Sequence, residues 1–385
     1  MRTIKLTEET KKNLLQDLLK RNPGSYGEYE GKVAGIVNAV RENGDAAVFA
    51  FTEQFDKAKI TAENIRVTGE ELNDAYAQVD PELIAVIRKA LGNIRSYHEK
   101  QRRYSWFDSQ ENGTLLGQKV MPLSKVGVYV PGGKAVYPSS VLMNIVPAKV
   151  AGVGKIVMTT PCGKDGKVNP TTLVAAHEAG ADEVYKVGGA QAIAALAFGT
   201  ESIPKVDKIV GPGNIYVALA KKAVYGHVNI DSIAGPSEIL VLADESANPR
   251  FVAADLLSQA EHDEMASAIL ITTSEALAQK VSDEVEEFVR VLQRKEIIRK
   301  SLDHYGYILL ADTMEDAIDA ANEIASEHLE IITKDPFHIM TKIRNAGAIF
   351  IGEYSSEPTI LRGRTMCFRQ MERQNSFPRC PSMIL

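Results

Sequence analysis

Gln259 and His262 carry side chains that could share a metal ion, because residues three apart on a helix project from one face. They belong to a helix that is expected to follow Asn248 and Pro249. Glutamine is an unusual zinc ligand, and a tetrahedral zinc site needs four donors where this pair supplies two. Spacing alone therefore favours a solvent-facing helix, with a metal site as the alternative.

His328 lies where the periodicity of a predicted helix requires an apolar side chain. That helix opens at Thr313 with Asp316 as its capping-box partner, and its core stripe comprises Ala317, Ile318, Ala321, Ile324 and Ala325. A histidine in such a stripe is usually a hydrogen-bonded core residue. The alternative is a proton-transferring group with the Glu327 carboxylate beside it at the helix end, which suits the oxidation of an alcohol through an aldehyde and its hydrate.

Three glycine turns could bring a cofactor close to the backbone. They are Pro131-Gly132-Gly133, Gly188-Gly189-Ala190-Gln191 and Gly211-Pro212-Gly213-Asn214. None is a GxGxxG fingerprint, and each alone is more often a tight turn, but polar Gln191 and Asn214 favour ligand contact. Tyr129 could stack on an adenine or pack between sheet and helix, and Ser237 could bind a ligand or cap the backbone.

Short β-branched runs followed by helical patterns position these residues from Lys125 onward. The first series comprises residues 126–130, 156–159, 183–187 and 208–210, and the second comprises 239–242, 268–272, 307–310, 329–332 and 348–351. The pattern predicts an α/β protein with two Rossmann-like lobes, each with an open and mostly parallel sheet. Ligands should then bind outside the carboxyl ends of the strands.

The first 120 residues favour helices and predict a helical N-terminal region. Leu14, Leu15, Leu18 and Leu19 form one stripe, and Val33, Ile36, Val37 and Val40 form another. Asp80 and Pro81 fit the N-cap and first position of a further helix, whose predicted core face is Leu83, Val86, Ile87, Ala90, Leu91, Ile94 and Tyr97. We expect this region to be a cap rather than a catalytic lobe.

Composition restricts the partners of the chain. Its 385 residues are 45% hydrophobic and 24% charged, and the net charge of −6 is spread over both signs, so neither nucleic acid nor a membrane surface is an expected partner. No run of about 18 apolar residues and no leader with an apolar segment occurs. Cys162, Cys367 and Cys380 form neither a disulfide framework nor a CxxC zinc pattern, so a reducing cytoplasm is expected.

Read in order, six motifs resemble the zinc-dependent, NAD-linked histidinol dehydrogenases from residue 1 to about residue 358. They are VGVYVPGGKAVYPSSVLMNIVPAKVAGV, YKVGGAQAIAALAFGT, KIVGPGN, IAGPSE, LLSQAEHDE and ASEHLE. The resemblance implies the last step of histidine biosynthesis, in which L-histidinol is oxidised through the aldehyde to L-histidine while two NAD are reduced. It also implies a homodimer.

The matching motifs imply a role for each candidate residue. Tyr129, Gln191 and Asn214 would contact NAD, and Ser237 would contact the substrate. Gln259 and His262 would bind a zinc ion that holds the substrate amine and imidazole. His328 would contact the substrate and act as general base for both oxidations, and Glu327 would activate the water that hydrates the aldehyde. The implied domains are a helical region (1–124), an NAD-binding lobe (125–236), a zinc and catalytic lobe (237–358) and an aberrant tail (359–385).

The residues after Pro358 depart from the family pattern. The family continues with a Gly-Asp-Tyr-Phe-Ala-Gly-Pro-Asn-His-type segment, whose Asp binds zinc and whose His meets the substrate, whereas this chain reads Thr-Ile-Leu-Arg-Gly-Arg. A later Glu and a later zinc-binding His of the family are not found either. Codons for Thr359 to Met366, read one base earlier, can encode Asp-Tyr-Phe-Ala-Gly-Pro-Asn-His, so a frame shift explains the departure.

The altered tail predicts impaired activity. Losing two of four zinc donors should greatly weaken metal binding, and the small C-terminal arm that reaches the partner subunit in this family would be missing or altered. Two rival functions stay open: a dehydrogenase of the same fold for another small polar alcohol, and a non-catalytic remnant that binds nucleotide.

Overall fold

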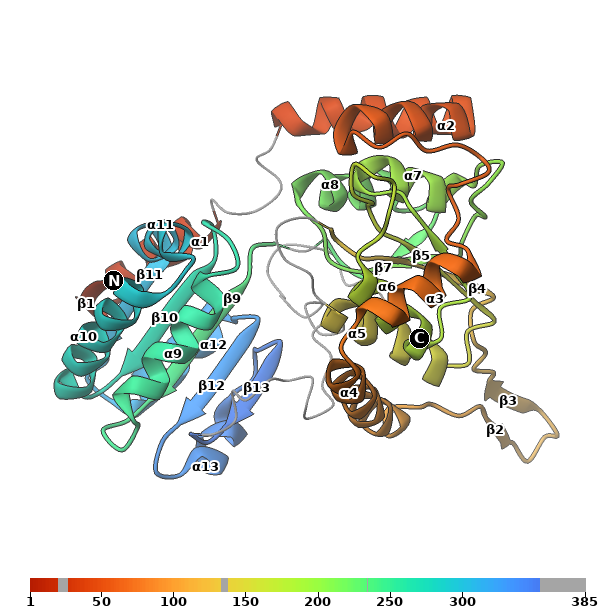
Figure 1. Ribbon diagram of the computed structural model, residues 1–385. Helices are drawn as coiled ribbons and strands as arrows, with labels where there is room; N and C mark the ends of the chain where they lie inside the picture. Colours follow the sequence, from red (N-terminus) through yellow and green to blue (C-terminus); the bar gives the residue numbers. More distant parts are fainter. Residues whose placement is uncertain (20–26, 133–137, 234, 354–385) are drawn as a thin grey trace. The chain divides into compact units, whose positions relative to one another are not determined.

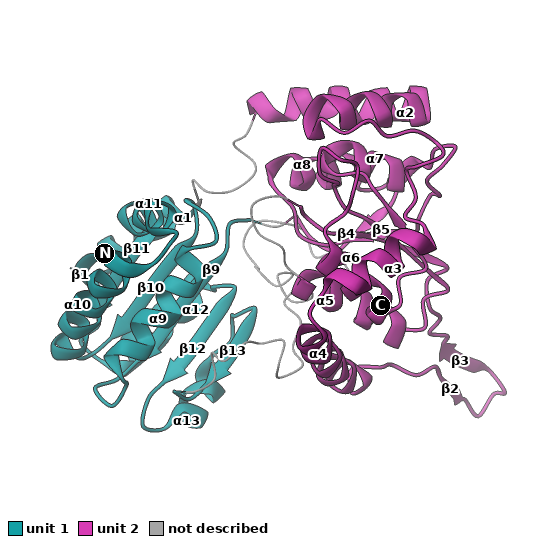
Figure 2. Cartoon of the chain, in the orientation of Figure 1, with its two compact units in different colours: residues 1–25, 235–357, 369–380 teal, residues 26–234, 358–368, 381–385 magenta. Residues whose placement is uncertain are grey.

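The computed structural model describes residues 1–19, 27–132, 138–233 and 235–353, which belong to two compact units (Figures 1 and 2). Unit 1 combines residues 1–19 with residues 235–353, and unit 2 contains residues 27–132 and 138–233. Gly133 of the first predicted turn and the whole 359–385 tail lie outside the described residues. No helix of the described chain is long and apolar enough to cross a membrane.

Unit 2 is built on a five-stranded parallel sheet with the order β6-β5-β4-β7-β8. Its strands are β4 (Lys125–Tyr129), β5 (Lys155–Thr159), β6 (Glu183–Tyr185), β7 (Lys208–Val210) and β8 (Asn229–Ile230). The chain starts in the middle at β4, runs to the β6 edge, and then crosses back to place β7 on the other side of β4. The strand order therefore reverses between β4 and β7, which is where open α/β sheets bind their ligands.

Helices cover both faces of the unit 2 sheet (Figure 1). One face carries α4 (Pro81–Glu99), α5 (Pro138–Val150) and α6 (Pro170–Ala179), with α3 (Gly69–Gln78) packed against α6. The other face carries α2 (Gly27–Asp56), α7 (Gly189–Phe198) and α8 (Ile215–Val224). The predicted N-terminal cap is thus wrong, because α2 and α4 bury their apolar stripes in the core of this unit and α3 packs against α6.

Unit 1 repeats the same plan with a six-stranded parallel sheet of order β1-β11-β10-β9-β12-β13. Its strands are β1 (Arg2–Lys5), β9 (Glu238–Ala243), β10 (Ser267–Thr272), β11 (Gly306–Leu310), β12 (His328–Ile332) and β13 (Ala348–Ile351). Counted from β9, the order is that of unit 2, with β1 added outside β11. The prediction of two similar lobes with parallel sheets is confirmed.

Two layers of helices cover the unit 1 sheet. One layer comprises α9 (Pro249–Ala260), α10 (Glu275–Val291) and α11 (Lys295–Tyr305), and the other comprises α1 (Glu8–Leu19), α12 (Met314–Ile324) and α13 (Pro336–Lys342). Leu14 of α1 is 1% exposed and packs in the same core as Leu240 and Leu242 of β9. The predicted 1–124 region is therefore divided between the two units, because its first residues complete this sheet and core.

In the N-terminal sequence, local signals predict the helices correctly but do not predict the strands. Asp80 caps α4 by accepting a hydrogen bond from the Glu82 N–H at 2.8 Å, as predicted. The predicted core face of α4 is partly wrong, since Leu83, Val86 and Tyr97 are exposed. Strand β1 and the hairpin of β2 (Trp106–Ser109) and β3 (Leu115–Gln118) were not predicted, because none of these strands has a buried residue to produce an alternating pattern.

Candidate functional site

Tyr129 lies at the carboxyl end of β4, beside the switch point of unit 2, and is 3% exposed. Its ring packs in the core between the sheet and α7, which favours the packing interpretation of this side chain. Its hydroxyl accepts a hydrogen bond from the Gly189 N–H at 3.2 Å, which ties the turn after β6 to the end of β4. Burial raises the pKa of Tyr129 to about 12, so the hydroxyl is protonated at neutral pH.

Gln191 lies in the first turn of α7 and is 1% exposed. Its side-chain oxygen is buried and accepts no hydrogen bond from the described residues. A buried polar atom without a partner costs about 1–3 kcal/mol. The position therefore favours a ligand or a water molecule that donates a hydrogen bond to this oxygen.

Asn214 lies in the turn after β7, on the other side of the switch point. Its side-chain oxygen caps α8 by accepting hydrogen bonds from the N–H groups of Tyr216 at 3.1 Å and Val217 at 3.3 Å. The side chain is exposed, and its amide nitrogen can donate to a ligand while the oxygen keeps its structural role. Tyr129, Gln191 and Asn214 thus share the carboxyl edge of one sheet, as the sequence predicts.

The sequence predicts that Glu327 and His328 lie at the end of a helix, and this prediction is wrong. Helix α12 begins after its Thr313 cap as predicted but ends at Ile324, because Ala325 adopts a left-handed conformation with φ of 52°. His328 is instead the first residue of β12, next to β9. Its position in the apolar stripe reflects burial in a sheet, where it is 3% exposed.

The imidazole of His328 is oriented by the neighbouring strand. Its Nδ1 lies 3.0 Å from the carbonyl oxygen of Glu238, the first residue of β9. A carbonyl oxygen only accepts, so Nδ1 carries the proton and the lone pair of the neutral ring is on Nε2. The Glu327 carboxylate lies 3.9 Å from the same Nδ1.

Glu238 and Glu327 bind each other's backbone at the start of their strands. The Glu238 N–H donates to Glu327 Oε2 at 3.4 Å, and the Glu327 N–H donates to Glu238 Oε2 at 3.3 Å. Sequence reasoning missed Glu238, although a charged residue that opens the apolar run Glu-Ile-Leu-Val-Leu-Ala is a signal for such a role. Ser237 directly precedes Glu238, and its carbonyl oxygen accepts from the Ser267 N–H at 3.0 Å.

The sequence predicts that Gln259 and His262 project from one helix, and this prediction is wrong. Helix α9 ends at Ala260, so Gln259 lies in its last turn and His262 follows in a turn, where the His262 N–H donates to the Gln259 carbonyl at 3.1 Å. The side-chain oxygen of Gln259 is buried and has no hydrogen-bond partner among the described residues. Desolvation by the surrounding protein lowers the pKa of His262.

The candidate residues of unit 1 gather at the amino edge of its sheet, whereas the carboxyl edge was expected. Ser237 and Glu327 directly precede β9 and β12. Helix α9 returns from the end of β9 to the start of β10, so its last turn brings Gln259 and His262 to the same edge. The predicted site residues therefore lie at the carboxyl edge of the sheet in unit 2 and at the amino edge in unit 1.

The described residues supply at most part of the predicted metal site. The unpartnered Gln259 oxygen and the His262 imidazole fit two positions of a zinc site. Among residues 1–19, 27–132, 138–233 and 235–353, no group of three or more His, Cys, Asp or Glu side chains could hold a metal ion. Any further donors must come from other residues or from the substrate.

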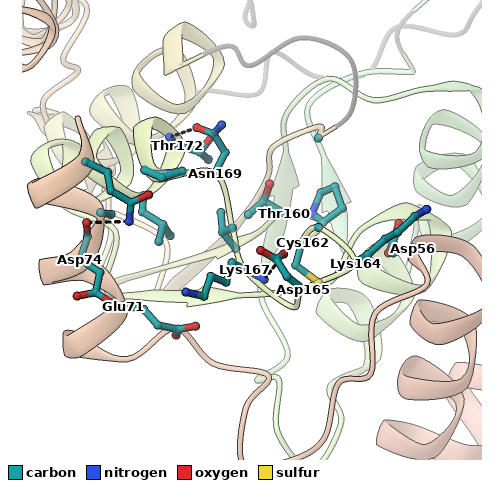
Figure 3. A pocket seen from close by; sticks show the side chains of 18 of the residues that line it. Asp56, Glu71, Asp74, Thr160, Cys162, Lys164, Asp165, Lys167, Asn169 and Thr172 are labelled. Carbon is teal, nitrogen blue, oxygen red and sulfur yellow. Dashed lines mark hydrogen bonds between the residues drawn. The ribbon is translucent and has the colours of Figure 1, made fainter. Parts of the chain in front are cut away.

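A pocket of about 580 Å³ lies elsewhere in unit 2, between the loop after β5 and helices α3 and α6 (Figure 3). Its wall includes Asp56, Cys162, Lys164 and Asn169, but not Tyr129, Gln191 or Asn214. Burial raises the pKa of the Cys162 thiol to about 11, so this cysteine is a weak nucleophile at neutral pH. The pocket thus reaches the first predicted glycine turn, at Pro131 and Gly132, but not the three side chains predicted to contact the cofactor.

Asp255 and Glu330 place two carboxyl groups in the core of unit 1, beneath α9. Both are buried, at 7% and 4% exposed. Burial first, and then the charge and hydrogen bond of Asp255, raise the pKa of Glu330 well above its usual value of 4.5. Between the unfolded and the folded pKa, the folded chain therefore holds a proton at Glu330 that the unfolded chain releases.

Glu330→Gln is expected to stabilise unit 1 above neutral pH. The amide resembles the protonated carboxyl in shape and hydrogen bonding, but it cannot ionise. In the parent chain, the loss of folding free energy caused by Glu330 is absent below its unfolded pKa of about 4.5. This loss grows as the pH rises toward the folded pKa. Urea unfolding at pH 8 should give the variant an advantage of about 1–3 kcal/mol that shrinks at pH 5. A constant difference at both pH values would contradict this account.

The class of the chain follows from its fold and site: it is a two-unit α/β protein with parallel sheets of one topology and an oriented His beside a Glu. The histidinol dehydrogenase family model matches residues 19–360. A histidinol dehydrogenase of Clostridium acetobutylicum is 56% identical over 343 residues, which cover 89% of this chain and 79% of that protein. One from Bacillus subtilis is 55% identical over 341 residues, which cover 88% of this chain and 79% of that protein.

A solved structure supports the same assignment. The crystal structure of histidinol dehydrogenase from Elizabethkingia anophelis matches with a TM-score of 0.87 at 36% identity, and the match covers 95% of this chain and 84% of that one. This chain belongs to the histidinol dehydrogenase family, which catalyses the last step of histidine biosynthesis. It is therefore an oxidoreductase by family.

Proposed function

We propose that this chain carries the NAD-dependent oxidation of L-histidinol to L-histidine, with turnover impaired by its residues after Pro358. The observation that carries the proposal, within the family, is the orientation of His328. Its Nδ1 donates to the Glu238 carbonyl at 3.0 Å, which fixes one tautomer and makes Nε2 the basic nitrogen of the ring. A buried neutral imidazole held in one tautomer is suited to act as a general base.

His328 would remove the hydroxyl proton of L-histidinol at Nε2 while the carbon-bound hydrogen leaves as hydride to NAD. The resulting aldehyde then adds water to give its hydrate, and Glu327 would accept a proton from that water. The proton that His328 holds after the first oxidation would pass to the aldehyde oxygen, which completes the hydrate and leaves His328 neutral. His328 would then take a hydroxyl proton of the hydrate as a second hydride leaves to a second NAD. Each oxidation thus releases one hydride to the cofactor and one proton to the imidazole.

Gln191 and Asn214, together with the hydroxyl end of the otherwise buried Tyr129, would contact NAD at the switch point of unit 2. The buried Gln191 oxygen needs a donor, and the Asn214 amide nitrogen can supply one to the cofactor. Gln259 and His262 would hold two positions of a zinc ion, and Ser237, His328 and these two residues would line the substrate site. When bound, zinc would hold the substrate amine and imidazole and so orient the hydroxyl-bearing carbon.

The tail is the proposed cause of impairment. Residues 359–385 contain no aspartate or histidine, although the family segment that follows Pro358 supplies an Asp ligand to zinc and a His to the substrate. Two protein donors bind zinc far more weakly than a complete set. We further propose a cytoplasmic protein whose homodimer is weakened by the same change.

A substrate panel tests the proposed reaction. A version in which residues after Pro358 are replaced by the corresponding segment of the Clostridium acetobutylicum relative should reduce NAD with L-histidinol, and two NADH should form per molecule consumed. Other small polar alcohols should give rates lower by about 10²-fold or more, because an amine and imidazole cannot be replaced without leaving site groups unpaired. Equal rates with another alcohol would favour a dehydrogenase of different specificity, and NADH binding without turnover would favour a nucleotide-binding remnant.

A further inference from the structure

A buried ion pair lies behind the cofactor turn of unit 2 and is not explained by the reaction. Lys221 of α8 and Asp231, which follows β8, are 3% and 5% exposed at their side chains and form a salt bridge. Burying two charges costs several kcal/mol per ion before their attraction is counted, and a buried pair often stabilises no more than apolar residues would. Stability alone is therefore a weak reason for this pair.

Both partners of the pair bind the backbone of one residue, Gly211. The Asp231 Oδ2 accepts from the Gly211 N–H at 2.8 Å, and the Lys221 ammonium donates to the Gly211 carbonyl at 3.0 Å. Asp231 is itself fixed, because its N–H donates to Ile209 O at 3.1 Å and its Oδ1 accepts from the Ser232 N–H at 2.6 Å. The N–H and C=O of Gly211 are thus held by opposite charges.

Gly211 is the residue at which the two sides of the switch point touch. It adopts φ of +117°, and a Cβ there would lie 2.0 Å from the carbonyl oxygen of Tyr129. The turn that starts at Gly211 ends at Asn214, which caps α8. Lys221 stands two turns further along α8 and reaches back to Gly211, so one helix fixes both ends of the turn.

We propose that Lys221 and Asp231 are positioning residues for the cofactor: they clamp Gly211 so that the end of β4 and the Gly211–Asn214 turn have the spacing that NAD requires. The inference rests on the proposed NAD function of unit 2. A ligand that spans two loops binds most tightly when neither must be ordered on binding. The charges therefore serve affinity for NAD more than the folding of the unit.

The test is a titration of the full chain with NADH in the absence of substrate. Binding is measured by the fluorescence of the nicotinamide ring. The Lys221→Met/Asp231→Asn double variant removes both charges of the pair together, so neither partner is left alone in the core, and the Asn amide oxygen can still accept from Gly211. The nearby buried Lys208 loses one attractive and one repulsive neighbour at the same time. We expect the dissociation constant for NADH to rise about tenfold or more, which equals ~1.4 kcal/mol. Lys221→Arg in the parent chain keeps the charge and a donor for Gly211, and should stay within about threefold of the parent.

Arg88→Met is the matched control, because Arg88 pairs with Glu178 in the same unit at 2.8 and 2.9 Å and contacts neither turn. Because the Arg88 side chain is 61% exposed, its loss should change the unfolding midpoint little, and it should leave NADH affinity unchanged. Unchanged NADH affinity in the double variant would overturn the inference and make the pair structural only. If the double variant does not fold, Asp231→Asn alone decides, with an unchanged affinity again overturning the inference. A parent chain that binds no NADH would overturn the proposed function, and the inference with it.

Discussion

Replacing His328 by asparagine is expected to lower kcat for L-histidinol about 10²–10⁴-fold, which is the range for loss of a general base. The variant belongs in the tail-restored chain, where turnover is measurable. Asparagine can donate to the Glu238 carbonyl as Nδ1 does, at 3.0 Å in the parent, so the fold of β12 is retained while the proton acceptor is removed. The KM for NAD should change little, because the predicted NAD residues belong to unit 2.

The control is His338→Asn, since His338 is an exposed histidine of α13 in the same unit. Its kcat should stay within about twofold of the parent. Glu327→Gln adds a separate observation: if Glu327 activates the hydrating water, the first NADH forms near the parental rate while the second is delayed and aldehyde accumulates. A His328→Asn enzyme with a kcat near that of the parent would remove His328 from the chemistry.

Gly211→Ala is expected to destabilise unit 2 by about 3 kcal/mol or more, because two costs add. The methyl group would meet the Tyr129 carbonyl oxygen at 2.0 Å, and φ of +117° is strained for any residue with a Cβ. The ends of β4 and β7 would have to separate, so NADH affinity should also fall by about tenfold or more. Urea unfolding and NADH titration measure the two effects.

Gly226→Ala separates strain from collision. Gly226 has φ of +98°, but no atom lies within 4 Å of the place that a methyl group would take, so the substitution should cost only the strain, about 1 kcal/mol. NADH affinity should then be unaffected. If the two alanine variants are equally stable, the close approach at the switch point is not a constraint on the fold.

The parallel sheets could be predicted from sequence because their strands are buried on both faces. All nine predicted strands occur, and Ile239–Leu242, for example, lies within β9, whose six residues are all buried. The same burial explains the misassigned His328. Periodicity reports that a position is buried, and the left-handed Ala325 that ends α12 before it has no strong sequence signal, since alanine rarely adopts that conformation.

The site itself could be predicted only in part. Gln191 and Asn214 were found because they lie in glycine turns that follow strands. Ser237 and Glu327 precede strands, so the same rule does not point to them, and Glu327 became a candidate only as the neighbour of His328. No sequence pattern pointed to Lys221 and Asp231. They are ten residues apart, and their role depends on an ion pair that forms only when α8 packs beside the end of β8. Pairings set by tertiary structure are not encoded in local spacing.

In the proposed function, the catalytic residues of a histidinol dehydrogenase are in place and the altered tail limits turnover. The most direct test is NADH formation from L-histidinol with added zinc, measured for this chain and for its tail-restored version. We expect little or no NADH from the chain as it stands and at least about 10³-fold more from the restored chain, which corresponds to ~4 kcal/mol. Equal turnover by the two would contradict the proposal, because the tail ligands would then be dispensable and the assignment of zinc to Gln259 and His262 would be wrong.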